Sequence, residues 1–126
     1  MAAERILIVD DNAANLKLAR ILLTEEGYDV RTAADAEEAL RILDTFLPRL
    51  ILMDIQLPGM DGLALTRRLK ADERTSDILI LALTAYAMKG DEERMLGAGC
   101  DGYVPKPIDV DGLPLLIADL IDRRRS

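Results

Sequence analysis

The 126-residue sequence predicts a single α/β domain built on a five-stranded parallel sheet. Short apolar runs alternate with longer segments whose apolar residues recur with helical period, which is typical of parallel α/β sheets. The composition, 50% hydrophobic and 31% charged, is that of a folded globular chain. No linker, repeat or low-complexity segment divides the sequence, so we expect one compact domain over 1–126.

The predicted strands lie near 5–10, 28–32, 49–54, 78–83 and 101–104. The first, third and fourth are nearly all apolar, as expected for central strands that are covered on both faces. The second alternates polar and apolar residues and is typical of an edge strand. Right-handed crossovers restrict the strand order without selecting one. An order of 2-1-3-4-5, the flavodoxin-like doubly wound arrangement, places the first and third strands on either side of the point where the winding reverses.

Each expected helix has its own start or stop signal. The first covers 15–26, where apolar residues recur at helical spacing and Gly27 supplies a C-terminal stop. In the second, Asp35 and Glu38 have the spacing of a capping box for a helix that continues through Phe46.

The three remaining helices follow the same logic. Asp61 can cap a helix from Gly62 to about Ala71. The acids of 91–93 open a fourth helix, or lie early in it, and a glycine at 97 or 99 ends it. Apolar residues at helical spacing predict the last helix over 110–123.

Polar residues follow four of the apolar runs where the predicted strands end. They are Asp10 and Asp11, Asp54, Thr84 and Lys106. Because the carboxyl ends of parallel strands meet at one edge of a sheet, we expect these side chains to lie together. Three crowded carboxylates repel one another, so one of them stays protonated unless a cation is present. Oxygen ligands without histidine or thiolate favour Mg²⁺, or Mn²⁺, over zinc, and the group predicts a phosphate and metal site.

The composition also excludes several classes of protein. A net charge of -7 leaves no basic face for a nucleic-acid backbone. The absence of histidine removes imidazole from every catalytic or metal-binding scheme. Cys100, the one cysteine, reads as a small packed residue and fits a reducing compartment. No signal peptide or membrane span is visible, so we expect no membrane partner and a cytoplasmic protein.

Four segments, in order and at matching spacing, resemble the receiver domain of two-component response regulators. They are Asp10-Asp11-Asn12, the run from Ile51 to Gly62, Leu83-Thr84-Ala85 and Lys106-Pro107. The resemblance implies that Asp54 accepts a phosphoryl group from a phosphohistidine on a histidine kinase or a histidine phosphotransfer protein. It also implies that Asp11, Asp54 and the main-chain carbonyl of Gln56 bind Mg²⁺ directly, with Asp10 contributing either directly or through a water. Thr84 and Lys106 then hold the phosphoryl oxygens, and the peptide before Pro107 is cis in the family.

The same resemblance implies how a phosphate becomes a signal. Thr84 moves toward the phosphoryl group and Tyr103 turns inward behind it, which switches the face formed by the fourth helix, fifth strand and last helix. Gln56 and Tyr86 border the path of the water that hydrolyses an aspartyl phosphate in the family. Neither offers a general base, so we expect slow self-dephosphorylation.

The segment from Thr84 to Arg94 is similar to single-domain phosphorelay and cell-cycle receivers and to the receiver modules of hybrid kinases. We therefore expect a receiver domain without an output domain, which catalyses only its own phosphorylation and dephosphorylation. It is expected to act on a downstream protein target as a monomer or weak homodimer.

Three alternatives remain at this point. A phosphatase of the haloacid-dehalogenase kind also uses a strand-end aspartate and Mg²⁺, but it needs a second aspartate where this chain has Gln56, and its cap domain is absent. A nucleotide-binding module needs a glycine-rich phosphate loop after a strand, and none is present. A receiver-fold interaction module that no longer depends on phosphate is disfavoured because all five functional positions are filled.

Overall fold

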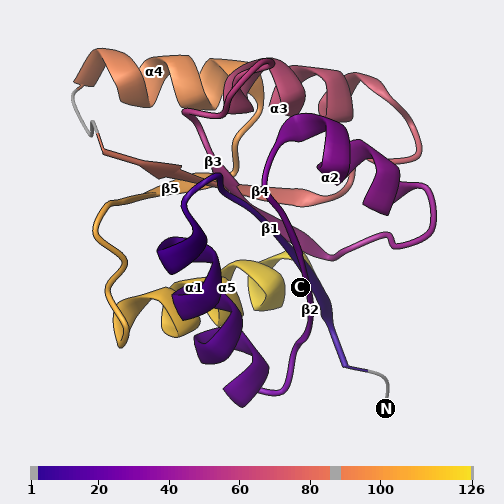
Figure 1. The fold of residues 1–126 in the computed structure, drawn as a ribbon. Coiled ribbons are helices and arrows are strands. Elements are labelled where there is room, and N and C mark those ends of the chain that lie inside the picture. The colour runs from indigo at the N-terminus through magenta and orange to yellow at the C-terminus, as the bar shows by residue number, and fades with distance from the viewer. Residues whose placement is uncertain (1–2, 86–88, 126) are drawn as a thin grey trace.

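The computed structural model describes residues 3–85 and 89–125 and shows strands and helices alternating along the chain (Figure 1). The strands are β1 (Arg5–Val9), β2 (Asp29–Ala33), β3 (Leu50–Asp54), β4 (Leu79–Thr84) and β5 (Gly102–Pro105). The helices are α1 (Ala13–Glu25), α2 (Ala36–Leu43), α3 (Gly62–Ala71), α4 (Lys89–Ala98) and α5 (Gly112–Arg125). The predicted α/β class is confirmed.

The five strands form one parallel sheet in the order β2-β1-β3-β4-β5. This is the predicted order, with β2 at an edge. The chain passes from β1 outward to β2 and then returns across β1 to start β3, so the winding reverses between β1 and β3. Ligand sites of such sheets lie outside the carboxyl ends of the strands at this reversal.

Helices α2, α3 and α4 cover one face of the sheet, and α1 and α5 cover the other (Figure 1). Side chains of a strand alternate between the two cores, so Leu7 and Val9 point to the first while Ile6 and Ile8 point to the second. Strands β3 and β4 are buried along their whole length. This burial on both faces explains why nearly all of their residues are apolar.

The ends of α1 and α2 show how local chemistry sets the boundaries. Helix α1 begins two residues earlier than predicted, because the Asn12 side chain accepts a hydrogen bond from the Asn15 N–H at 3.0 Å and caps it. Gly27, at φ 95°, ends it as predicted. The prediction that α2 reaches Phe46 is wrong. Helix α2 ends at Leu43, and a tight turn follows in which the Asp44 and Thr45 N–H groups donate to the carbonyls three residues back, at 3.2 and 3.1 Å. Pro48 disfavours helical backbone at the residue before it, so the helix does not resume.

The other boundaries differ from the sequence-based ranges by at most two residues. Helix α5 begins at Gly112 rather than 110, after a turn in which the Asp109 carboxylate accepts the Asp111 N–H at 3.1 Å. Cys100 is buried, as predicted. In the part of the chain that the structure describes, no helix has the length and apolar character needed to cross a membrane.

Candidate functional site

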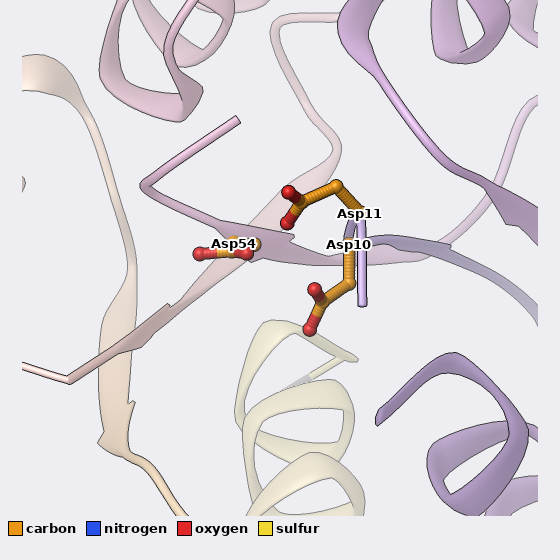
Figure 2. Close-up of side chains that lie close together, drawn as sticks. All are labelled: Asp10, Asp11 and Asp54. Atoms are coloured by element: carbon orange, nitrogen blue, oxygen red, sulfur yellow. The ribbon is translucent and has the colours of Figure 1, made fainter. Parts of the chain in front are cut away.

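Three carboxylates meet where β1 and β3 end (Figure 2). Val9 of β1 is paired with Met53 of β3, so the residues that follow them, Asp10 and Asp54, reach the same level of the sheet. One oxygen each from Asp10, Asp11 and Asp54 lies within 4.8 Å of the others. Asp10 and Asp54 are 1% exposed, whereas Asp11 is open to solvent. The predicted convergence of these three acids is therefore present.

Among the described residues, each of the two buried carboxylates, Asp10 and Asp54, has one hydrogen-bonded oxygen and one without a hydrogen bond. Asp10 Oδ1 accepts the Asn12 N–H at 2.9 Å, and Asp54 Oδ1 accepts the Gln56 N–H at 3.0 Å. Asp10 Oδ2 and Asp54 Oδ2 are buried and accept no hydrogen bond from the described residues. Lys106 Nζ lies 3.2 Å from Asp54 Oδ2, which makes an ion pair without hydrogen-bond geometry. Two buried, incompletely compensated oxygens side by side suit a bound cation.

The electrostatics of this cluster act on Asp54. Burial raises the pKa of its carboxyl group, the hydrogen bond from the Gln56 N–H lowers it, and the neighbouring Asp10 carboxylate raises it again. Lys106 lowers the pKa in part, and the net direction is upward. Without a cation, burial and, to a smaller extent, the neighbouring Asp10 carboxylate thus favour a proton on Asp54.

Thr84 and Lys106 come from the next two strands of the sheet. Thr84 ends β4, is 5% exposed, and lies one residue beyond Leu83, the partner of Asp54. The Lys106 N–H donates to the Thr84 carbonyl at 2.7 Å, which fixes the end of β5 against the end of β4. The peptide between Lys106 and Pro107 is cis. Both residues therefore lie at the carboxyl edge with the acids.

The loop after Asp54 returns closely over its own start. The Gly62 N–H donates to the Ile55 carbonyl at 2.8 Å. A Cβ on Gly62 would overlap the Asp54 carbonyl oxygen and lie 2.8 Å from Ile55 Cα. Gly62 was expected only as the start of the helix after Asp61 and as the end of a motif segment, although the lack of a Cβ is what allows so close an approach of two backbone segments.

A cavity of about 190 Å³ is lined by the loop after Asp54, the end of β4 and helix α4. Its lining includes Gln56 at the exposed rim, Thr84, and Arg94 of α4. Tyr103 of β5 is partly buried against the core beneath α2, α3 and α4. Tyr86, predicted to influence the lifetime of the phosphate, lies outside the described residues.

Comparison with known proteins identifies the family. The sequence pattern of the response regulator receiver domain matches residues 6–118. The polar-differentiation response regulator DivK of Brucella ovis is 48% identical over 105 residues, which cover 83% of this chain and 85% of that protein.

Solved structures agree with this match. The receiver domain of sensor histidine kinase PA1611 from Pseudomonas aeruginosa PAO1 has a magnesium ion coordinated in its active-site cleft. It is 36% identical to this chain, with a TM-score of 0.86, and the match covers 96% of this chain and 99% of that one. The chemotaxis response regulator CheY4 of Vibrio cholerae, at 24% identity and a TM-score of 0.89 over 94% of this chain and 98% of that one, shows the fold alone. The resemblance drawn from the sequence motifs is confirmed, and the chain belongs to the response regulator receiver domains of two-component systems.

Proposed function

We propose that this receiver accepts a phosphoryl group on Asp54 from a phosphohistidine of a histidine kinase or histidine phosphotransfer protein. The observation that carries the proposal is a buried strand-end carboxylate that has two further acids within 4.8 Å and the Lys106 ammonium at 3.2 Å. An oxygen of Asp54 forms a bond to phosphorus while the nitrogen–phosphorus bond of the donor breaks. The imidazole nitrogen keeps the electron pair of that bond and takes up a proton.

The residues present fit a divalent cation. Asp10, Asp11 and Asp54, together with the main-chain carbonyl of Gln56, would hold Mg²⁺, or Mn²⁺ in its place. The fit rests on the buried second oxygens of Asp10 and Asp54, which lack hydrogen bonds within the described residues. The magnesium-bound receiver of PA1611 supports this choice of ion. When bound, the ion neutralises the negative charge of the transferring phosphoryl oxygens.

Lys106 and Thr84 are proposed to hold the phosphoryl oxygens from the opposite side. The Lys106 ammonium already faces Asp54, and its side chain is only 22% exposed, which strengthens its electrostatic effect. The Thr84 hydroxyl can donate a hydrogen bond to a phosphoryl oxygen. Together they stabilise charge that the Asp54 carboxylate alone would repel.

Phosphorylation is proposed to act outward through Thr84 and Tyr103. Thr84 would move toward the new phosphoryl group, and Tyr103 would turn further into the core, which alters the face formed by α4, β5 and α5. Helices α4 and α5 expose Leu96 and Leu115, at 51% and 73%, and exposed apolar side chains suit the binding of a downstream protein. Gln56 and Tyr86 supply no general base, so slow self-dephosphorylation is expected.

The remaining expectations belong to the same proposal. The chain would act as a single receiver domain, monomeric or weakly dimeric, whose only catalysis is its own phosphorylation and dephosphorylation. The cytoplasm is the expected compartment, because the unpaired Cys100 suits a reducing environment.

Incubation with Mg²⁺ and acetyl phosphate, followed by intact mass measurement, tests the proposal. The wild-type protein is expected to gain one phosphate, and Asp54→Asn none. Asp44→Asn, which changes an exposed acid after α2, serves as the matched control and should gain the phosphate normally. A gain that persists in Asp54→Asn, or no gain at all, would remove the mechanism. Turnover of many phosphates per chain would instead favour the phosphatase alternative.

A further inference from the structure

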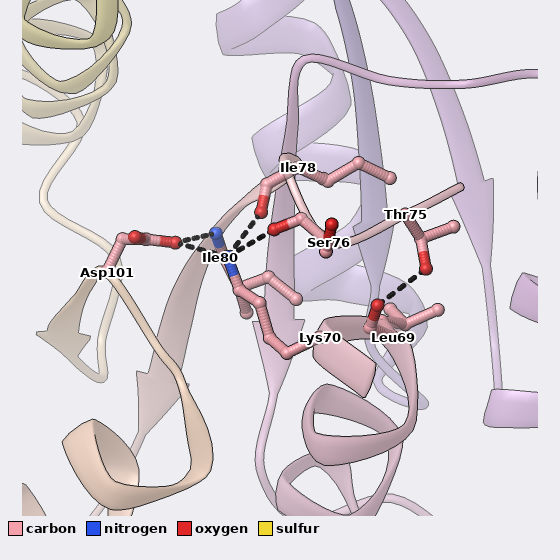
Figure 3. A network of polar contacts seen from close by, with 7 residues as sticks. All are labelled: Leu69, Lys70, Thr75, Ser76, Ile78, Ile80 and Asp101. Atoms are coloured by element: carbon pink, nitrogen blue, oxygen red, sulfur yellow. Dashed lines mark hydrogen bonds and ion pairs between the residues drawn. The ribbon is translucent and has the colours of Figure 1, made fainter. Parts of the chain in front are cut away.

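A second polar cluster lies at the opposite edge of the sheet, where β4 and β5 begin (Figure 3). Lys70 of α3 directs its Nζ to the carbonyl of Ile78 at 2.7 Å, to Asp101 Oδ2 at 3.1 Å and to the carbonyl of Ser76 at 3.4 Å. Asp101 Oδ2 also accepts the Ile80 N–H at 2.8 Å, and the Asp101 N–H donates to the Ile80 carbonyl at 2.8 Å. We call Lys70 and Asp101 the Lys70–Asp101 clamp.

The clamp is held in place by its surroundings. The side chains of Lys70 and Asp101 are 20% and 27% exposed, so solvent screens their interaction only in part. The turn between α4 and β5 packs on the lysine stem, since a Cβ on Gly99 would lie 2.8 Å from Lys70 Cγ. Gly99 also has a φ of 108°, which other residues rarely adopt. The three donors of the ammonium thus meet three acceptors in a fixed geometry.

Strand β5 depends on such an anchor. It has four residues and lies at the edge of the sheet, where β4 is its one neighbour among the described strands. Asp101 fixes the start of β5 against Ile80, and the hydrogen bond from the Lys106 N–H to Thr84 fixes its end. A slip of one residue would move Lys106 by roughly 3.3 Å and turn Tyr103 to the other face of the sheet.

We infer that Lys70 and Asp101 are positioning residues for phosphoryl transfer, because they set the register of β5 and thereby hold Lys106 within reach of Asp54. The inference rests on the proposed function. Lys106 Nζ must stay near its present 3.2 Å from Asp54 Oδ2 to receive the phosphoryl charge. A misplacement of about 1 Å caused by a change far from the chemistry can slow a reaction by roughly 100-fold.

The test measures the rate at which acetyl phosphate phosphorylates Lys70→Met and Asp101→Ala at saturating Mg²⁺. Methionine keeps the lysine stem against Gly99 and loses the ammonium. Both variants are expected to react about ten- to 100-fold more slowly than wild type. Asp101→Asn keeps an oxygen that can accept the Ile80 N–H, and it should recover most of the rate. The main-chain amide signals of residues 103–106 should shift in Asp101→Ala, as measured by heteronuclear NMR.

Thr75→Val is the matched control. Thr75 is 2% exposed and its Oγ1 donates to the Leu69 carbonyl at 2.6 Å at the same end of α3 (Figure 3). The substitution keeps the side-chain shape and removes that bond without touching β5. It should lower the unfolding temperature and leave the phosphorylation rate and the amide signals of 103–106 unchanged.

All variants are compared at a temperature at which each is fully folded, and Lys70→Met carries the test if Asp101→Ala does not fold. Rates of the clamp variants equal to wild type, or slowed no more than Thr75→Val, would overturn the positioning role while leaving the proposed function intact. A wild-type protein that takes up no phosphate would instead refute the proposed function and, with it, the reaction that the clamp is inferred to serve.

Discussion

The two edges of the sheet each pair a lysine with an aspartate, yet the two pairs are built differently. Lys106 Nζ lies 3.2 Å from Asp54 at the carboxyl edge, and Lys70 Nζ lies 3.1 Å from Asp101 at the amino edge. Asp101 Oδ2 also receives a main-chain N–H, whereas Asp54 Oδ2 accepts no hydrogen bond from the described residues and faces the Asp10 carboxylate. The two lysine–aspartate distances are therefore similar, but within the described part of the chain the Asp101 oxygen is hydrogen-bonded and the Asp54 oxygen is not.

The difference separates a structural pair from a chemical one. Buried polar groups in folded proteins are nearly always hydrogen-bonded, so a satisfied cluster such as Lys70 and Asp101 stabilises one arrangement of the chain. A buried carboxylate oxygen left without a hydrogen bond costs stability. Asp10 and Asp54 carry that cost at the edge where ligands of this fold bind, which suits a site completed by a cation and a phosphoryl group.

The largest expected effect is on the chemistry at the carboxyl edge. Lys106→Ala should slow phosphorylation by acetyl phosphate by about 10²- to 10³-fold, because one preorganised positive group is removed from the transferring phosphoryl oxygens. Stabilisation by Mg²⁺ should persist, since Lys106 is not a proposed metal ligand. Lys17→Ala, an exposed lysine on α1, is the charge-matched control. A rate for Lys106→Ala equal to that of Lys17→Ala would contradict its role.

Adding Mg²⁺, which is proposed to bind at the carboxyl edge, should raise the free energy of unfolding of the protein. At a concentration 100 times its Kd, a ligand that binds only the folded protein raises the free energy of unfolding by about 2.7 kcal/mol. Thermal unfolding with and without Mg²⁺ measures this gain, which should shrink in Asp11→Asn. Asp11 is exposed, so its replacement should leave the fold intact. Asp111→Asn is the control, and equal gains in both variants would argue against Asp11 as a ligand.

Gly62 and Gly97 differ in the space available for a Cβ atom. Gly62→Ala should lower the free energy of unfolding by about 1–3 kcal/mol, because its Cβ meets backbone atoms of Asp54 and Ile55 that cannot move aside. Gly97→Ala within α4 has open space and should stabilise the protein by up to about 1 kcal/mol. Urea unfolding measures both. If Gly62→Ala is as stable as Gly97→Ala, the close contact between Gly62 and the backbone of Asp54 and Ile55 is incorrect.

A smaller effect is expected on the pH dependence of stability without Mg²⁺. Burial raises the pKa of Asp54 above its ordinary 3.8, so the folded protein keeps a proton that the unfolded chain releases. The contribution of Asp54 to stability is therefore complete below pH 3.8 and is lost as the pH rises through the raised pKa.

Urea unfolding of wild type and Asp54→Asn, measured from below pH 3.8 to neutral pH, isolates the contribution of Asp54 to the free energy of unfolding. The stability of wild type minus that of Asp54→Asn should fall with rising pH and then become constant. A difference that grows with pH would show that the carboxylate form of Asp54 is favoured by folding, which is opposite to the arrangement described.

Simple rules predict which strands are central and that residues ending neighbouring strands meet, whereas the crossover rule left the strand order open and 2-1-3-4-5 was expected as the flavodoxin-like arrangement. Apolar runs that lack alternation must lie at the centre of a parallel sheet, and residues that end neighbouring strands must meet at one edge. Asp10, Asp11 and Asp54 come together because the first and third strands are neighbours, as the 2-1-3-4-5 order requires. Their roles, and those of Thr84, Lys106, Gln56, Tyr86 and Tyr103, stay predictions until the reaction is measured.

Features that depend on distant contacts could not be predicted. Lys70 and Asp101 are 31 residues apart in the sequence, and each alone is an ordinary charged residue with no pattern around it. The overlap at Gly62 depends on how the loop from Asp54 returns to α3. The capping box of Asp35 and Glu38 marks where α2 begins but not where it ends, so it could not place the end at Leu43 rather than Phe46.

The most direct test of the central claim is to identify the phosphorylated residue. After reaction with acetyl phosphate and Mg²⁺, sodium borohydride reduces an acyl phosphate of aspartate to homoserine, and peptide mass spectrometry then locates the change. Homoserine is expected at position 54 and at no other acid. Homoserine at Asp10, Asp11 or another position, or a phosphate gain that leaves residue 54 as aspartate, would contradict the central claim.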